Sequence, residues 1–150
     1  MTTETTYITD LLNGSIQSIK NVIAIENTIS KPKRVEKSLH IHYGVLIGFV
    51  GEIKGKLMIT GELSVFAFIG EQLFGMPLEG EMLKSFTGEL GNMIAGGIST
   101  AIGNQGVDID ITAPTIIEGD SNLSGYTKGI TIDVVFANQQ SFSLSLLIDQ

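Results

Sequence analysis

A carboxylate and an amide stand three residues apart inside an apolar, glycine-rich segment of this chain. Ser85, Glu89, Asn92 and Gly96 follow one another at spacings of four, three and four residues, so on a helix all four share one side. The carboxylate and the amide would then stand beside Gly91, Gly96 and Gly97 and present two polar groups over nearly bare backbone. Polar pairs at this spacing also occur on ordinary solvent-facing helices, so periodicity alone leaves a purely structural interpretation open.

The segment that carries the stripe is predicted to be one long helix over residues 78–103. After its first turn five glycines interrupt it, at positions 88, 91, 96, 97 and 103. Because each interior glycine costs a helix about 1 kcal/mol relative to alanine, we expect another helix or a partner protein to approach closely here. The apolar side chains recur at helical spacing and form a separate face: Leu83, Phe86, Leu90, Met93, Ile94, Ile98, Ala101 and Ile102.

Two further helices are predicted upstream of this one. Residues 6–24 have an apolar stripe at three- and four-residue spacing, which is typical of an amphipathic helix. Residues 62–75 suit a short helix that ends at Gly75, with Pro77 just beyond it, as is usual at a helix C-terminus. The basic segment between them, Lys31-Pro32-Lys33-Arg34, is expected to be a solvated loop.

Period-two alternation of apolar side chains indicates antiparallel strands in two parts of the chain. Residues 35–60 are expected to form two or three strands, with a turn or bend at Gly44. The later part contains a strand that Pro114 ends or bends, followed by a hairpin, at residues 107–112, 129–137 and 141–148. This order predicts an α+β fold, an antiparallel sheet with helices packed on one side, in a single domain spanning residues 1–150.

Composition excludes several classes of function. The 150 residues carry 16 acidic and 9 basic side chains, a net charge of −7, and no cysteine. This excludes thiolate zinc sites, disulfides and cysteine nucleophiles, and it disfavours binding to a nucleic-acid backbone. Residues 57–150 hold 11 of the acidic and 2 of the basic side chains, which favours a lysine-bearing partner surface. With no secretory signal and no membrane-spanning stretch in the sequence, we expect a cytoplasmic protein without membrane insertion.

The polar stripe resembles the signature of the CheC/CheX/FliY chemotaxis phosphatases. In that signature an Asp or Ser, three residues, a Glu, two residues and an Asn are followed by a more distant Pro. The corresponding residues here are Ser85, Glu89, Asn92 and Pro114, with the proline one residue early. A single clear Glu-x-x-Asn copy resembles the CheX branch more than CheC, which carries two.

The resemblance extends over nearly the whole chain. The text ELGNMIAG, which begins at Glu89, is similar to the family's core helix. The glycine-punctuated segment VLIGFVGEIKGKLMITGE, residues 45–62, is similar to the hairpin that precedes the family's helix. A CheC/CheX-like fold is therefore expected.

The resemblance implies a phosphatase that acts on the aspartyl phosphate of a CheY-like response regulator. In the family the helix enters the regulator's active site, so Asn92 would orient the attacking water and Glu89 would pair with the regulator's lysine. Ser85, Gly96 and Pro114 would contact the partner. Mg²⁺ would be supplied by the phosphorylated partner, and this chain would hold no metal or cofactor of its own.

Two other expectations follow from the same resemblance. CheX members form homodimers by joining their sheets edge to edge, and the serine-rich, alternating strand over residues 141–148 is compatible with such an edge. Asp10-x-x-Asn13 in the first helix mimics Glu89-x-x-Asn92, so Asp10 and Asn13 form a candidate, weaker second site. Aspartate is one methylene shorter than glutamate, however, and the flanking residues lack the glycines of the long helix.

Other functions stay open at this point. The same fold can serve as a non-catalytic module that binds a receiver domain or a motor component, or as a small acidic assembly subunit whose glycines only pack helices. His40 and His42 project from one face of a predicted strand, where a metal would need a carboxylate as third ligand, and we expect solvated strand residues instead. The acidic side chains between residues 108 and 120 lack the spacing of an EF-hand loop and suit an exposed strand face.

Overall fold

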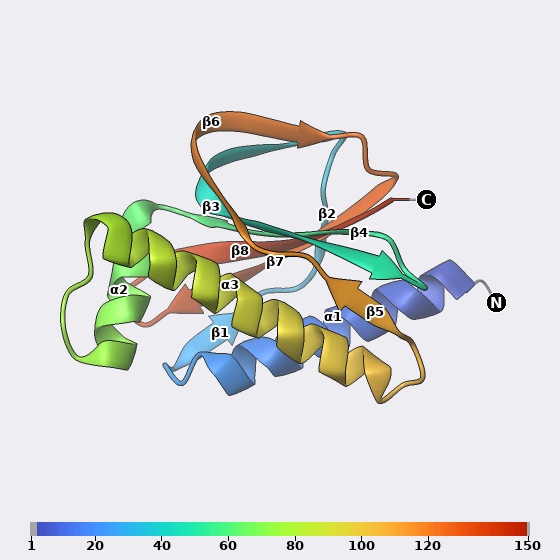
Figure 1. The fold of residues 1–150 in the computed structure, drawn as a ribbon, viewed down its shortest axis with the longest axis horizontal. Coiled ribbons are helices and arrows are strands. Elements are labelled where there is room, and N and C mark those ends of the chain that lie inside the picture. The colour runs from blue at the N-terminus through green and yellow to red at the C-terminus, as the bar shows by residue number, and fades with distance from the viewer. Residues whose placement is uncertain (1–2, 150) are drawn as a thin grey trace.

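The chain folds into two layers, an antiparallel sheet and a layer of helices that covers one face of it (Figure 1). The computed structural model describes residues 3–149, with side chains from residue 7 onward. The elements along this part of the chain are α1 (Thr3–Val22), β1 (Asn27–Ile29), β2 (Lys33–Arg34), β3 (Ser38–Gly51), β4 (Gly55–Gly61), α2 (Leu63–Phe74), α3 (Gly80–Gly103), β5 (Ile109–Ile111), β6 (Thr115–Ser124), β7 (Lys128–Phe136) and β8 (Ser141–Ile148).

The strand order places the chain's last strand in the middle of the sheet. Neighbouring strands follow the order β1-β7-β8-β4-β3-β5, and every pair is antiparallel. β2 lies along the same outer side of β7 as β1, and β6 continues along the same outer side of β3 as β5. The predicted α+β fold, with an antiparallel sheet and its helices on one side, is therefore confirmed.

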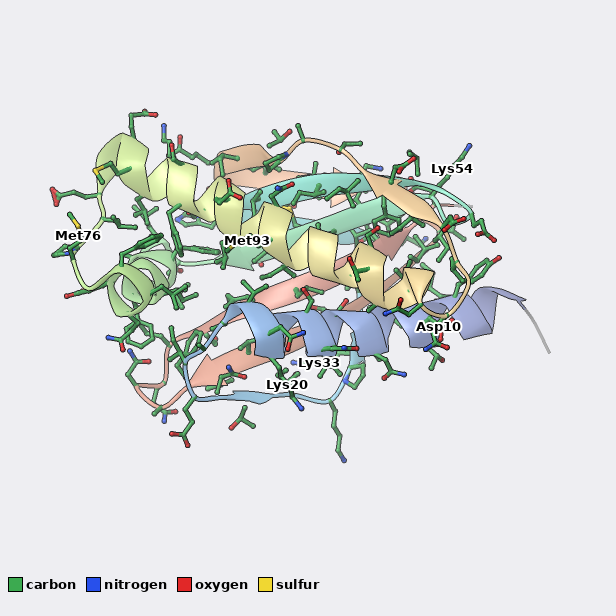
Figure 2. All side chains as sticks on the ribbon, turned by 60° about the horizontal axis from the view of Figure 1, so that its bottom comes forward. Asp10, Lys20, Lys33, Lys54, Met76 and Met93 are labelled. Carbon is green, nitrogen blue, oxygen red and sulfur yellow. The ribbon has the colours of Figure 1, made fainter. Side chains whose placement is uncertain are left out.

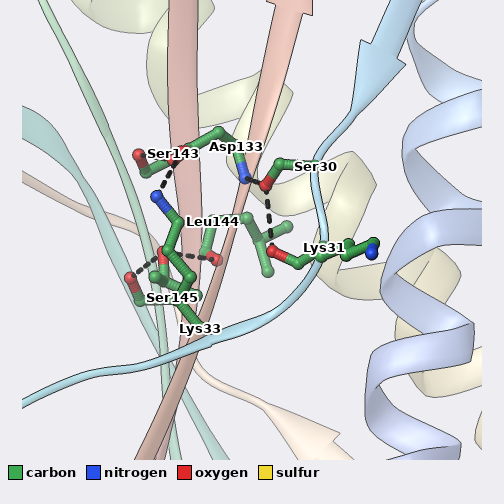
Figure 3. A network of polar contacts seen from close by, with 8 residues as sticks. Ser30, Lys31, Lys33, Asp133, Ser143, Leu144 and Ser145 are labelled. Atoms are coloured by element: carbon green, nitrogen blue, oxygen red, sulfur yellow. Dashed lines mark hydrogen bonds and ion pairs between the residues drawn. The ribbon is translucent and has the colours of Figure 1, made fainter.

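The serine-rich strand over residues 141–148, whose sequence is compatible with a sheet edge, lies inside the sheet. β8 pairs with β4 on one side and with β7 on the other. Two of its serines hydrogen-bond to side chains of β7. Ser143 donates a hydrogen bond to Asp133 Oδ1 at 2.6 Å, and Ser145 donates one to Thr131 Oγ1 at 3.0 Å. β2 closes this network, because Lys33 Nζ lies 3.2 Å from Asp133 Oδ2 (Figure 3).

The main core lies between the helices and the sheet. Alternate residues of β7 and β8 point into it, among them Val134, Phe142 and Leu144, which are fully or almost fully buried. Each such side chain stabilises the fold by about 1.5–3 kcal/mol through burial alone. A second, smaller cluster of Ile41, Met58 and Leu147 lies on the opposite face, where β6 and the first half of β3 curl away from the helix layer (Figure 1).

Three local expectations differ from the structure. β3 continues through Gly44 without a turn, although its pairing with β6 shifts register between Ile41 and Tyr43. The glycine serves close packing, since a Cβ on it would lie 2.2 Å from the carbonyl oxygen of Ile59 on β4. Lys33 and Arg34, expected in a loop, form the short exposed strand β2. Met93, assigned to the apolar face of the long helix, has 42% of its surface exposed, because it lies beyond the edge of the buried stripe.

Candidate active site

α3 is fixed against the sheet by a buried hydrogen-bond pair and by a glycine. Tyr43 on β3 donates from its hydroxyl to Thr87 Oγ1 at 3.0 Å, and Thr87 donates to the carbonyl of Leu83 at 2.9 Å. One turn further on, a Cβ on Gly91 would lie 2.7 Å from Val45 Cγ1. The missing side chain therefore lets α3 approach β3 more closely than any other residue would allow.

α3 is also fixed against α1, which runs antiparallel to it. Ser18 of α1 donates to the carbonyl of Ile94 at 2.7 Å, and a Cβ on Gly97 would lie 2.2 Å from Ser18 Oγ. Towards the end of α3, a Cβ on Gly14 would lie 3.3 Å from Ala101 Cβ. Contacts to β3 on one side and to α1 on another leave a single outward direction for the remaining residues of the helix.

The predicted polar stripe occupies that outward side. Ser85 and Glu89 are exposed, and Asn92 and Gly96 are half-buried. No heavy atom lies within 4 Å of a Cβ placed on Gly96, so bare backbone faces solvent next to the amide. Met93, labelled in Figure 2, marks this part of α3 on the outer surface of the helix layer. The four residues therefore share one accessible surface.

The carboxylate and the amide have no side-chain partner within the described part of the chain. Neither Glu89 nor Asn92 makes a side-chain hydrogen bond or ion pair with any residue that the structure describes. Lys84, the basic residue on α3, is already engaged, with its Nζ 3.0 Å from Glu118 Oε1 and 3.6 Å from Glu81 Oε1. The hydrogen bond and the charge of Glu118, helped by Glu81, hold the pKa of Lys84 above its usual value. The charge of Glu89 is thus left for an external cation.

Pro114 lies beside the same part of α3. It belongs to the link between β5 and β6 and is half-buried. A Cβ on Gly88 would lie 3.9 Å from Pro114 Cγ and 3.8 Å from Ile116 Cδ1, which are ordinary van der Waals distances. The structure therefore brings together four of the predicted positions along α3 and places the proline next to the turn that carries Glu89.

An apolar groove, which no pattern in the sequence predicts, adjoins the stripe. It is an open hollow of about 670 Å³, and Ser85 and Glu89 form part of its wall. The groove is lined otherwise by Leu73, Phe74, Met76, Leu78, Glu81, Met82, Phe86 and Met93. The sequence signal for this groove is the cluster of large apolar residues at the α2–α3 link, Phe74, Met76 and Met82. Nothing in their spacing assigns them to the core, and in the structure all three are exposed.

The candidate second site lies elsewhere on the helix layer. Asp10 is half-buried and Asn13 is exposed on α1. Because the adjoining Gly14 packs on Ala101, this pair lies beside the last turns of α3, far along the helix from Glu89. Figure 2 shows Asp10 well separated from Met93. The structure does not bring the two pairs together.

The histidines lie on the part of β3 that pairs with β6. His42 Nδ1 is 3.1 Å from Asp120 Oδ1, and His40 Nδ1 is 3.3 Å from Asn122 Oδ1, all on exposed side chains. Among the side chains that the structure describes, residues 7–149, no group of three or more His, Asp or Glu is arranged to hold a metal ion. None of the helices in this part of the chain is both long and apolar enough to cross a membrane.

Comparison with known proteins defines the class. The sequence profile described as "Chemotaxis phosphatase CheX" matches residues 43–135. A CheC-like superfamily protein from Shewanella sp. PV-4 has a similar fold, with a TM-score of 0.78 and 23% identity over 100% of both chains. A CheX–CheY–BeF₃–Mg²⁺ complex from Borrelia burgdorferi gives a TM-score of 0.76 at 22% identity, covering 96% of this chain and 98% of the other. The fold is that of the CheC-like proteins.

The profile match places the chain more narrowly, and it belongs to the CheX chemotaxis phosphatase family. The chain is also 29% identical over 147 residues to the "CheY-P phosphatase CheX" of Thermotoga maritima, covering 94% of this chain and 95% of that protein. The resemblance expected from the stripe is confirmed at the level of the family. The roles of the individual residues stay a prediction.

Proposed function

We propose that this chain accelerates hydrolysis of the aspartyl phosphate of a CheY-like response regulator, with Glu89 and Asn92 acting in the regulator's active site. The main observation behind this proposal is that Glu89 and Asn92 are accessible and have no side-chain partner among the described residues. They lie on a helix that contacts with β3 and α1 hold in place. The similarity to a named CheY-P phosphatase, and to a CheX crystallised with CheY, supports the choice of substrate. We take residues 1–150 to act as one domain, in the cytoplasm.

In this mechanism the amide of Asn92 positions the attacking water. The oxygen of water bonds to phosphorus while the bond from phosphorus to the aspartyl oxygen breaks, which releases inorganic phosphate and restores the aspartate. Phosphoryl transfer of this kind passes through a loose transition state, so positioning and electrostatics supply most of the catalysis. A neutral amide holds the water without repelling the anionic phosphoryl group.

Glu89 acts as the docking group. Its carboxylate meets the regulator's active-site lysine, and hydrogen bonds between charged groups are about twice as strong as neutral ones. Because Lys84 is engaged by Glu118 and Glu81, no cation on the same helix competes for this carboxylate. Ser85, exposed one turn before Glu89, extends the contact surface.

Gly96 and Pro114 complete the contact surface in this proposal. Gly96 offers backbone without a side chain beside the amide, and Pro114 flanks the helix at Gly88. Mg²⁺ belongs to the regulator, where it offsets the negative charge of the phosphoryl group. The Borrelia complex, which contains Mg²⁺ and BeF₃ together with CheY, supports that assignment.

The test follows the decay of phosphorylated cognate CheY-like receivers with four versions of the chain. We expect the wild type to accelerate decay and Asn92→Ala to lose at least about a hundredfold of the rate, as when one group that stabilises a transition state is removed. Glu89→Ala should raise KM by about tenfold or more through the lost charged hydrogen bond. Asn21→Ala, an exposed amide on α1, is the matched control and should behave as the wild type.

Equal decay with the wild type and with Asn92→Ala, for every cognate receiver, would overturn the catalytic proposal. The alternative function would then be a non-catalytic module that binds the receiver or a motor component through the same surface. Receiver binding by a protein without acceleration is the observation that would establish it.

A homodimer joined through sheet edges is part of the proposal. The outer positions are β1 and β2 along β7, and β5 and β6 along β3, so one of these edges would have to pair with a second copy. Light scattering should give twice the mass of the chain. A monomer at micromolar concentration would contradict the dimer and leave the proposed chemistry unaffected.

A further inference from the structure

The groove beside Glu89 is formed by side chains that pack on one another in the fold. Its floor consists of Leu78 and Phe86, which are 8% and 7% exposed, and its rim carries the far more exposed Phe74 and Met82. The ring of Phe74 meets that of Phe86 edge-on, with centroids 5.6 Å apart and planes at 84°. Such pairs stabilise their geometry beyond simple burial.

The link between α2 and α3, which forms one wall of the groove, is anchored at two points. α2 ends at Gly75, which has a φ of 75° and donates its N–H to the carbonyl of Glu71 at 2.8 Å. Leu78 then packs on Gly70, where a Cβ would lie 2.7 Å from Leu78 Cδ1. Met76, between the two anchors, is held out at the rim and is 50% exposed.

Exposed apolar surface is concentrated here. Of the six large apolar side chains that are exposed among the described residues, four line this groove, namely Phe74, Met76, Met82 and Met93. Contiguous apolar patches of this kind mark interaction surfaces, and methionine adapts well to a partner's shape because it is flexible and polarizable.

The groove and the polar stripe form one continuous surface. Ser85 and Glu89 belong to both, and Glu81 adds a second carboxylate at the groove. The basic residue nearby, Lys84, is paired with Glu81 and Glu118. A complementary partner therefore presents apolar side chains next to a lysine.

Two other occupants fit less well. A small polar ligand would need buried polar groups to orient it, and in the part of the chain that the structure describes no buried side-chain nitrogen or oxygen lacks a hydrogen-bond partner. A second copy of this chain would meet the groove with the same patch, which would set Glu81 and Glu89 close to their own equivalents and repel it.

We infer that the groove binds apolar side chains of the receiver domain, adjacent to the lysine that Glu89 meets. The inference rests on the proposed function and assigns a docking role to Met76, Met82 and Phe74. Because these side chains lie away from the reacting phosphoryl group, they contribute equally to the ground state and the transition state. Their removal should raise KM and leave kcat unchanged.

The experiment compares a Met76→Ala/Met82→Ala double variant with Leu63→Ala. Leu63, the first residue of α2, is 49% exposed and lies outside the groove, so it controls for loss of an exposed apolar side chain on a helix. For the double variant we expect KM for the phosphorylated receiver, and Kd for the BeF₃-loaded receiver, to rise about tenfold. The kcat should stay within about twofold, and Leu63→Ala should match the wild type.

The possible failures are distinguishable. Unchanged KM and Kd in the double variant, with an active wild type, would refute the groove and leave the proposed function standing. A fall in kcat at constant KM, or a change of oligomeric mass at constant Kd, would also refute it. If the wild type binds the receiver without accelerating decay, and the double variant binds about tenfold more weakly, the proposed function fails while the groove assignment holds. Thermal melts of all variants verify that they fold.

Discussion

Gly96 and Gly97 are neighbours on α3, and replacing each of them by alanine should change stability in opposite directions. The two substitutions gain the same helix propensity, about 1 kcal/mol. A Cβ on Gly96 meets no heavy atom within 4 Å, whereas a Cβ on Gly97 would lie 2.2 Å from Ser18 Oγ and 2.9 Å from Ser18 Cβ. Only the second substitution therefore has a packing penalty.

The size of that penalty follows from the contacts. Overpacking of a close helix contact costs about 1–3 kcal/mol. Displacing the Ser18 hydroxyl also loses its 2.7 Å hydrogen bond to the carbonyl of Ile94, which costs about 1 kcal/mol. After the gain in propensity, Gly97→Ala should be net destabilising by about 1–3 kcal/mol, while Gly96→Ala should be stabilising by about 1 kcal/mol.

Urea and thermal unfolding of both variants measure this difference of about 2–4 kcal/mol, which is at least about 4 °C in Tm for a domain of this size. Ser18→Gly removes both of these atoms at its own cost in helix propensity of up to about 1 kcal/mol. The double variant Ser18→Gly/Gly97→Ala should therefore be less destabilised than the sum of the two single variants. If both alanine variants were stabilised, or both destabilised equally, the reasoning that α1 sets the position of α3 through Gly97 would be refuted.

Three further predictions concern other contacts. Tyr43→Phe removes the buried hydrogen bond to Thr87 and should cost about 1 kcal/mol in chemical unfolding; an unchanged midpoint would contradict that role. Glu118 raises the pKa of Lys84 in the folded protein above the usual value of 10.5. Their pairing therefore stabilises the fold fully at pH values below 10.5, and this stabilisation is lost as the pH rises through the higher pKa of the folded state. The stability difference between wild type and Lys84→Gln should therefore shrink in alkaline solution, and a constant difference would contradict the pairing. Asn13→Ala should leave receiver dephosphorylation unchanged, whereas a clear loss of rate would establish a second site on α1.

The periodic parts of this fold were predictable from sequence. α3 and the β7–β8 hairpin have apolar side chains at a regular spacing, and each buries the face that the spacing indicates. β6 was not predicted as a strand of its own because it lies along a curled outer side of β3. All its residues there are exposed or half-buried, and Gly119 and Asp120 interrupt any alternation. β1 and β2 are only three and two residues long, too short to produce a period.

The position of the polar stripe on α3 was predictable from sequence, and the apolar groove beside it was not. Ser85, Glu89 and Asn92 are fixed on one side of α3 by helix geometry alone. The apolar groove depends on tertiary contacts, namely Leu78 on Gly70 and Phe74 on Phe86, which leave no local pattern. Met93 was assigned to the core for a related reason: spacing places it near the apolar face, and only the packing of neighbours decides on which side of the boundary it falls.

Hydrolysis and binding measured on one preparation of Asn92→Ala test the central claim most directly. The claim is that an exposed amide on α3 acts on a phosphoryl group held by another protein. It predicts that this variant binds the BeF₃-loaded receiver with a Kd near that of the wild type and no longer accelerates decay of the phosphorylated receiver. Wild-type acceleration that persists without the amide would contradict it.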